Sequence, residues 1–424
     1  MAGNRLSIPL LSLVVLTACA TRGVDHAHSA MDVPQVVAEA SPTESAAAET
    51  PESTSREHAD RAKNVFDVDP DEPVYSESAE MAPASPALIV LVSERRKNYV
   101  AMPVFFATDR RLITNRDGTV GFGPQRGILS YGVCEVSIPR DHRIGVLETP
   151  SIWKLEFSEN PEKHVVLLST TVRSPDLFYQ AVAQRVRLSK RKSAFVFVHG
   201  YNVTFEDAAR RTAQMSYDLG FDGAPVFYSW PSQGVTHRYT VDEQNVEWAQ
   251  ANLRQFLGDF FARSGSTDVY LVAHSMGNRA LTGALKTLLA ERPTLKSRLK
   301  EIILTAPDID AEVFRRDIAP ALASNGRPVT LYASADDKAL MLSKQVHGYP
   351  RAGDAGDGLV IVPGVETIDA TGMDAGFLGH SYYGDNRSVI SDIYYVMRDG
   401  KRANDRFGLV PRDISRGRYW VFKK

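Results

Sequence analysis

Hydrophobic residues follow two different patterns along the chain from about residue 95 onward. The first consists of short runs rich in Val, Ile, Phe and Tyr, which Gly, Pro, Asn and Asp separate. This pattern is typical of antiparallel strands, and it occupies residues 104–107, 130–138, 152–157 and 165–171. From residue 176 onward, wholly apolar runs alternate with amphipathic helical segments. Such alternation predicts a mostly parallel sheet with helices on both faces, so we expect an α/β fold with antiparallel N-terminal strands.

The same spacing predicts the helices and strands of the second part. Thr204 precedes a helical segment whose first turn holds Glu206 and Asp207, an arrangement that caps a helix and complements its dipole. Pro293 marks where a later helix must stop. In chain order, we expect helices at 176–190, 204–219, 241–263 and 278–291, and strands at 194–198, 225–229, 268–273, 301–306 and 328–333.

The strand that begins at Asp268 leads into a serine held between small residues. Ala273, Ser275 and Gly277 have the spacing of the G-x-S-x-G nucleophile elbow, with alanine in the first small position. A serine at such a tight strand-to-helix turn is strained, and larger neighbours would clash. The turn lifts the hydroxyl clear of the sheet and directs the N–H groups of the next helix towards developing negative charge. We therefore predict that Ser275 is a nucleophile.

A glycine loop follows the strand at 194–198 and reads His199-Gly200-Tyr201-Asn202. In the nucleophile-elbow arrangement, one oxyanion donor comes from a loop of this kind and the other from the residue after the serine. We therefore predict that the backbone N–H groups of Tyr201 and Met276 form the oxyanion hole. An ordinary glycine turn after a strand is the alternative interpretation.

An acid is expected after the serine, because chemistry in such sheets gathers at the carboxyl ends of the strands. The strand at 328–333 is followed by Asp336 and Asp337, and the strand at 301–306 is followed by Asp308. One carboxylate must be buried against the imidazole to fix its tautomer. We prefer Asp337, then Asp308, then Asp336, and for each of them a carboxylate that only caps a helix is the alternative.

Two histidines, His347 and His380, follow these acids. His347 stands at a predicted helix end, where a solvent-facing histidine is ordinary. His380 follows Gly379 in a loop between the last strand signals and the final helix. A neutral imidazole near pH 7 can both accept and return a proton, so we prefer His380 as the general base.

The residues in this order resemble the α/β-hydrolase superfamily, over roughly residues 95–400. Four strings are similar to a bacterial esterase- or lipase-like branch of unknown function: Phe106-Ala107-Thr108-Asp109-Arg110, Ser137-Ile138-Pro139-Arg140, Tyr228-Ser229-Trp230-Pro231-Ser232 and Ala306-Pro307-Asp308-Ile309-Asp310. The resemblance implies the α/β-hydrolase fold and a Ser-His-Asp triad, and it stops short of a substrate. Ala273 in place of the first glycine is a substitution that the superfamily tolerates.

This set of residues predicts a serine hydrolase that cleaves carboxylic esters of small-molecule or lipid-like substrates through an acyl-enzyme. A non-catalytic envelope lipoprotein that uses the fold as a binding platform is the alternative. An acyltransferase or peptidase on the same triad would differ only in acceptor or leaving group. We expect no cofactor and no metal, because the sequence has no Cys/His metal spacing. The formal net charge of -2 gives no reason to expect nucleic acid.

The N-terminal residues predict an envelope location. Arg5 precedes a short apolar run that ends in Leu16-Thr17-Ala18-Cys19, which resembles a bacterial lipoprotein box. The resemblance implies a signal peptide at 1–18 and a lipid on Cys19 as the membrane anchor. Ala20 after the cysteine implies the outer membrane, with the protein facing the periplasm.

The composition changes after this anchor. Residues 20–90 hold 14 Asp and Glu against four Lys and Arg, with few large apolar side chains. Such a segment cannot bury enough surface to offset its ordering entropy. We therefore expect a disordered acidic tether at 19–94 and one hydrolase domain at 95–424. The only other cysteine, Cys134, lies in a strand-like run, so we expect a buried thiol there.

Overall fold

The computed structural model describes residues 97–116, 118–150, 156, 158–323, 329–373 and 387–423. The predicted signal peptide, the predicted lipid anchor at Cys19 and the tether lie outside these ranges, and so do the predicted base His380 and most of the predicted strand at 152–157.

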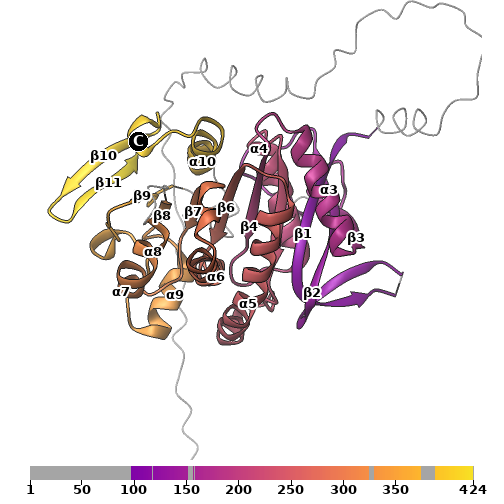
Figure 1. Ribbon diagram of the computed structural model, residues 1–424, viewed down its shortest axis with the longest axis horizontal. Coiled ribbons are helices and arrows are strands. Elements are labelled where there is room, and N and C mark those ends of the chain that lie inside the picture. Colours follow the sequence, from indigo (N-terminus) through magenta and orange to yellow (C-terminus); the bar gives the residue numbers. More distant parts are fainter. Residues whose placement is uncertain are drawn as a thin grey trace, which may run out of the picture. The chain divides into compact units, whose positions relative to one another are not determined.

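An eleven-stranded sheet runs through the described residues in the order β10-β11-β9-β8-β7-β6-β4-β5-β1-β2-β3. Figure 1 shows it with helices on both sides. Its strands are β1 (Tyr99–Thr114), β2 (Val120–Pro139), β3 (Val166–Arg173), β4 (Ser193–Val198), β5 (Ala224–Ser229), β6 (Asp268–His274), β7 (Leu299–Thr305), β8 (Val329–Ala333), β9 (Val365–Asp369), β10 (Leu409–Ile414) and β11 (Gly417–Phe422).

The middle of the sheet is parallel and its N-terminal end is antiparallel, as the sequence predicts. β5, β4, β6, β7, β8 and β9 pair in parallel with their neighbours, whereas β1, β2 and β3 form an antiparallel ladder. β1 also pairs in parallel with β5 and joins the two parts. Side chains that alternate along each central strand enter two separate cores, one on each face.

Helices cover both cores. α3 (Pro175–Leu188), α5 (Tyr239–Arg263) and α6 (Gly277–Glu291) pack on one face with the short α7 (Ala311–Val313) and α8 (Ala319–Ala323). α4 (Phe205–Asp218) and α10 (Arg387–Asp399) pack on the other. α9 (Lys338–His347) follows β8. This arrangement confirms the predicted α/β fold with helices on both faces. None of the helices in the described ranges has the length and apolar character needed to cross a bilayer.

Local sequence explains where α4 begins. The Thr204 hydroxyl accepts from the N–H of Asp207, and the Asp207 carboxylate accepts in return from the N–H of Thr204. This capping box satisfies two N–H groups that α4 cannot bond internally, so the predicted cap is confirmed. The predicted buried thiol is also present, because Cys134 lies fully buried within β2.

Two strands after the last helix were not predicted. β10 and β11 form an antiparallel hairpin that joins the sheet through two residue pairs between β11 and β9. Most of β10 is exposed, and Arg418 pairs with Asp413 across the hairpin at 2.8 Å. β10 is the edge strand and lacks the apolar run by which the central strands can be recognised. β11 lies inside the sheet and buries Trp420 and Phe422, so its short apolar run at 419–422 was a signal that sequence reasoning missed.

A buried histidine attaches the loop after β2 to the end of α4. The His142 Nδ1 lies 2.7 Å from the Glu148 carboxylate, and its Nε2 lies 2.8 Å from the Asp218 carboxylate. Burial by itself lowers the pKa of His142. The two carboxylates outweigh this effect and raise its pKa to about 9, so the imidazole is a cation at neutral pH.

Replacing His142 with Gln should flatten the dependence of stability on alkaline pH. Because the folded pKa exceeds the ordinary value of 6.5, the contribution of the cation is fully present below pH 6.5 and is lost as pH rises to about 9. Urea denaturation should show a steeper loss of unfolding free energy between these pH values for the wild type than for the variant. Equal slopes would contradict the assignment.

Candidate active site

Four loops that carry predicted site residues lie at one edge of the sheet. β4, β6, β7 and β8 are parallel neighbours, so their carboxyl ends all point to that edge. The loops that leave these ends carry Tyr201, Ser275, Asp308 and Asp337 in turn. β9 is parallel to β8 as well, so the chain also leaves β9 at this edge, before the part that contains His380. The parallel order of the strands therefore brings together segments that are far apart in the sequence.

Ser275 has the strained backbone expected of a nucleophile elbow. Its φ angle is +48°, in the left-handed region that a non-glycine residue seldom adopts. The Ser275 N–H donates to the carbonyl of Thr305 at 3.0 Å, and its carbonyl accepts from the Asn278 side chain at 2.8 Å. Neighbouring segments thus hold the strained turn in place, and α6 begins directly after it at Gly277.

The loop after β4 touches this turn so closely that only glycine fits at two positions. A Cβ atom on Gly277 would lie 2.2 Å from the carbonyl oxygen of His199. A Cβ atom on Gly200 would lie 2.9 Å from both the Ser275 Cβ and the His274 Nδ1. The backbone of the predicted oxyanion loop is therefore packed against the predicted nucleophile.

Asp337 is buried, and it caps a helix. Its Oδ1 accepts from the N–H groups of Ala339 and Leu340, both at 2.9 Å, at the start of α9. Desolvation raises the pKa of Asp337, and the two N–H donors oppose that shift. The bonds that Asp337 makes to described residues use one carboxylate oxygen. The helix-cap role that the sequence left open is therefore real, and the catalytic role stays a prediction.

Asp308 is a buried anion bound by two arginines. Its carboxylate lies 2.9 Å from Arg351 Nε and 3.2 Å from Arg279 Nη2. Burial alone raises the pKa of Asp308, but the two guanidinium groups outweigh it, so the pKa lies below its usual value. The hydroxyl groups of Tyr239 and Ser343 also donate to this carboxylate, at 2.6 and 2.5 Å. Asp308 is thus the centre of a structural network at the edge where Ser275 stands, and its N–H donates to the Ser275 carbonyl at 3.2 Å.

The second-choice histidine belongs to the same network. His347 Nδ1 lies 2.7 Å from the Ser343 carbonyl, and its Nε2 lies 2.7 Å from the Glu243 carboxylate. Glu243 also pairs with Arg279 at 2.7 Å. Both ring nitrogens of His347 are therefore occupied by structural partners. The preferred histidine, His380, lies outside the described residues.

Asp336, the third candidate acid, is exposed, and its carboxylate accepts from the N–H of Gly372 at 2.8 Å.

Within the described ranges, no group of three or more His, Cys, Asp or Glu side chains has a geometry that could hold a metal ion. The polar edge of the sheet is instead held by the arginine–carboxylate pairs.

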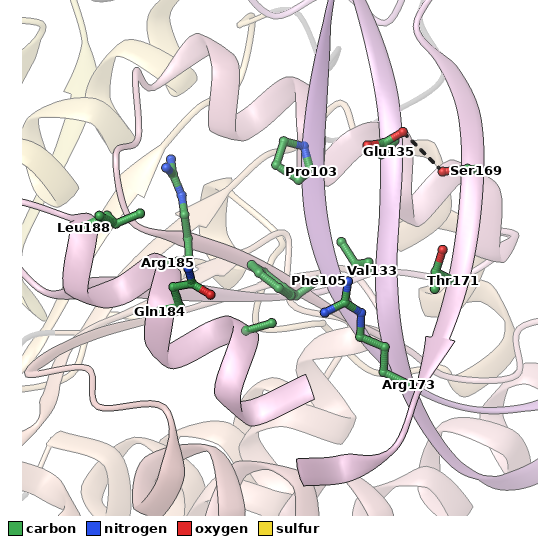
Figure 2. A pocket seen from close by; sticks show the side chains of 11 residues that line it. Pro103, Phe105, Val133, Glu135, Ser169, Thr171, Arg173, Gln184, Arg185 and Leu188 are labelled. Atoms are coloured by element: carbon green, nitrogen blue, oxygen red, sulfur yellow. Dashed lines mark hydrogen bonds between the residues drawn. The ribbon is translucent and has the colours of Figure 1, made fainter. Parts of the chain in front are cut away.

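A surface depression lies elsewhere on the fold. Figure 2 shows it between α3 and the antiparallel strands, with the Glu135 carboxylate bonded to Ser169 beside it. Its lining residues all come from β1, β2, β3 and α3; they include Phe105, Val133, Arg173 and Arg185. The depression therefore does not coincide with the edge that carries Ser275.

Sequence reasoning missed Tyr239, Arg279, Ser343 and Arg351. They come from α5, α6, α9 and the Gly/Asp-rich segment at 348–358, and each contacts Asp308. No spacing in the sequence connects four polar residues on four separate segments. The only available signal was that Asp308, if buried, would require cationic side chains near it, since a buried carboxylate must be paired.

Residues 174–397 match the family described as Alpha/beta hydrolase of unknown function (DUF900). The match extends from the start of α3 into α10, which is more than half of the chain. The protein therefore belongs to this family of α/β hydrolases. The strands β1, β2, β3, β10 and β11 lie outside the matched residues.

Solved structures show distant likenesses. An uncharacterized protein from Bacillus cereus is 12% identical with a TM-score of 0.32; the match covers 50% of this chain and 61% of that protein. A predicted CIB-like hydrolase from Thermoplasma acidophilum is 15% identical with a TM-score of 0.30, covering 55% and 93%. Brefeldin A esterase, described as a bacterial homologue of human hormone sensitive lipase, is 13% identical with a TM-score of 0.30, covering 76% and 80%. Curated proteins gave no significant match. The family match, rather than these likenesses, carries the assignment.

Asp308→Asn should destabilise the folded protein by about 3 kcal/mol, because it removes the carboxylate that pairs with the buried Arg351 guanidinium and leaves Arg279 with Glu243 alone among the described carboxylates. Urea denaturation monitored by circular dichroism measures the change. The matched control is Asp336→Asn, an exposed change that should stay within about 0.5 kcal/mol of the wild type. If both variants were equally stable, Asp308 would not be the centre of the network.

Proposed function

We propose that this α/β hydrolase is a serine hydrolase that cleaves carboxylic esters through an acyl-enzyme. In this proposal Ser275 is the nucleophile, His380 the general base and Asp337 the acid that orients it. The backbone N–H groups of Tyr201 and Met276 stabilise the oxyanion. The observation that carries the proposal is the close contact between the loop at 199–203 and the strained turn at Ser275.

The chemistry proceeds in two halves. The Ser275 Oγ attacks the ester carbonyl carbon while its proton passes to His380, and the carbonyl oxygen becomes an anion held by the two N–H groups. Collapse of this intermediate releases the alcohol, which takes the proton from His380. Water then attacks the acyl-enzyme by the same route, which releases the acid and restores Ser275.

Asp337 suits the orienting role better than Asp308 does. The carboxylate of Asp308 is already bound by Arg279 and Arg351, so it has little capacity left for an imidazole. Asp337 contacts the start of α9 through one oxygen, and it stands after β8, next to the strand from which the chain runs on towards His380. These contacts favour the order of preference taken from the sequence.

The substrate is proposed to be a small-molecule or lipid-like ester. Lipid-like substrates fit the proposed location at the outer membrane. There, a lipid on Cys19 would anchor the protein, and the segment at 19–94 would tether the hydrolase domain in the periplasm. A panel of p-nitrophenyl esters with graded acyl length would define the class, since the preferred length reports the size of the acyl site.

A fluorophosphonate should label Ser275 covalently, because a serine that can transfer its proton to a positioned imidazole is a strong nucleophile. Ser275→Ala should abolish labelling and ester cleavage together. His380→Ala should slow labelling strongly, and Asp337→Asn should lower turnover by a factor of up to ~10⁴. Intact-mass spectrometry with and without the probe measures the labelling.

The variants also test the alternatives. Labelling that survives Ser275→Ala would place the nucleophile elsewhere. Folded wild type that never labels would favour a binding platform. A larger loss of turnover in Asp308→Asn than in Asp337→Asn, at equal folded fraction, would move the acid to the loop after β7.

The membrane anchor has its own test. Cys19→Ser should release the protein from the membrane fraction and prevent its labelling by an azido fatty acid in cells, because the acyl chains attach at that sulfur. Cys134→Ser is the matched control, since that thiol is buried in β2 and should not affect the anchor. Acylated, membrane-bound Cys19→Ser protein would overturn the proposed anchor.

A further inference from the structure

A chain of buried polar side chains connects β1 to the loop at 199–203. The strings at 106–110 and 228–232 resemble the family, but they take no part in the proposed chemistry. In the sheet, β1, β5, β4 and β6 lie side by side in that order. Arg110 on β1 donates from Nε to the Ser229 hydroxyl on β5 at 2.8 Å. The same hydroxyl lies 3.1 Å from Nε2 of His199, which follows β4.

The hydrogen bonds of this relay, which consists of Arg110, Ser229 and His199, take their direction from its two ends and from the neutral state of the His199 ring. A guanidinium can only donate, so the Ser229 oxygen accepts from Arg110. At the other end, His199 Nδ1 lies 2.8 Å from the Gly200 carbonyl, which can only accept. Nδ1 therefore carries the proton. Burial beside the charge of Arg110 keeps the ring uncharged, so Nε2 has no proton and accepts from the Ser229 hydroxyl. His199 is then a neutral imidazole in the Nδ1–H tautomer.

Other contacts support a neutral, immobile imidazole. His199 is buried, and its ring stacks on Trp230 with centroids 5.1 Å apart and planes 18° from parallel. Desolvation, together with the charge of Arg110, holds the pKa of His199 well below its ordinary value. The Trp230 indole N–H donates to the His199 carbonyl at 2.8 Å. Both the ring and the backbone of His199 are thus held by β5 and its loop.

The charged groups around the relay hold the rest of the loop. Arg110 also donates to the carbonyls of Val203 at 2.7 Å and Ser232 at 2.8 Å. The carboxylate of Asp242, on α5, accepts from the Ser232 hydroxyl at 2.6 Å and from the Asn202 N–H at 3.3 Å. Arg110, Asp242 and Trp230 therefore bond to the backbone of the loop at Val203, Asn202 and His199.

The bond from His199 to the Gly200 carbonyl has a consequence for the next N–H. The Gly200 carbonyl and the Tyr201 N–H belong to the same peptide unit, which is trans and planar, so they point in opposite directions. A donor that holds the carbonyl therefore sets the direction of the N–H. That N–H is the predicted oxyanion donor, in the loop packed on Ser275.

We propose that Arg110, Ser229 and His199 are positioning residues that orient the Tyr201 N–H as an oxyanion donor. The inference rests on the proposed function, because an oxyanion donor has meaning only if Ser275 attacks a carbonyl. Preorganised donors stabilise the transition state more than the bound substrate, so the relay should affect kcat rather than KM.

The orientation can be tested without any substrate. In ¹⁵N-labelled full-length protein, NMR of the imidazoles should include a neutral Nδ1–H ring that does not titrate between pH 5 and 8. Its signals should disappear in His199→Asn, which assigns them. A His199 ring with its proton on Nε2, or one that titrates in this range, would overturn the relay.

The catalytic part is tested by Ser229→Ala, which removes the link between Arg110 and His199. With p-nitrophenyl acetate, kcat should fall about 100-fold while KM stays within about twofold, since the loss of one oxyanion donor lowers kcat about 10²–10³-fold. The matched control is Ser266→Ala, another fully buried serine, whose hydroxyl bonds to none of the described residues and which lies in the loop before β6. It should keep wild-type kcat.

Conservative replacement of the histidine separates positioning from folding. The Asn amide can place an N–H near the Nδ1 position, so His199→Asn should keep about tenfold more kcat than His199→Leu at equal melting temperature. Equal kcat for wild type and Ser229→Ala, when both label with the fluorophosphonate, would overturn the positioning role. Wild type that never labels would instead overturn the proposed function and the catalytic part of this inference, while the NMR result would still decide the relay.

Discussion

The close packing of the loop that begins at His199 against the turn at Ser275 is the constraint on which the candidate active site depends. The turn at Ser275 and the loop that begins at His199 approach until a single added carbon on Gly277 would lie 2.2 Å from a carbonyl oxygen. That approach requires two neighbouring parallel strands, β4 and β6, to end at the same level. It also requires a residue with φ of +48° to persist at Ser275. The surrounding hydrogen bonds make this possible, because strain of this kind survives only where neighbours over-determine it.

At the same edge of the sheet, their different surroundings shift the pKa values of the buried acids Asp308 and Asp337 in opposite directions. Asp308 is bound by two guanidinium groups and stays ionised, whereas Asp337 has backbone donors and a raised pKa. Environment rather than residue type therefore separates a structural anion from a candidate for catalysis. The arginine–carboxylate network also joins α5, α6 and α9 at the edge of the sheet, which limits how far any of them can move independently.

Several features could be predicted from the sequence because they depend on local patterns. The central strands are apolar on both faces, the capping box at Thr204 needs residues only three apart, and the elbow needs small residues beside Ser275. The edge strand β10 could not be predicted in this way, since it is mostly exposed and holds charged residues. β11 does contain a short apolar run at 419–422, and sequence reasoning missed it. Arg351 was missed for another reason. Its partner, Asp308, is 43 residues away, and no periodicity connects them.

The sequence by itself determined the class of fold, the position of the elbow and the order in which candidate residues follow it. These follow from hydrophobic spacing and turn chemistry, which act over a few residues. Only the tertiary structure decided which acid is bound by arginines and that the string around Arg110 reaches the loop at Gly200. These outcomes depend on strand order: β1 and β5 lie next to β4, although 119 residues separate Arg110 from Ser229. Hydrogen bonds and buried charges act through space, and that proximity exists only once the sheet has formed.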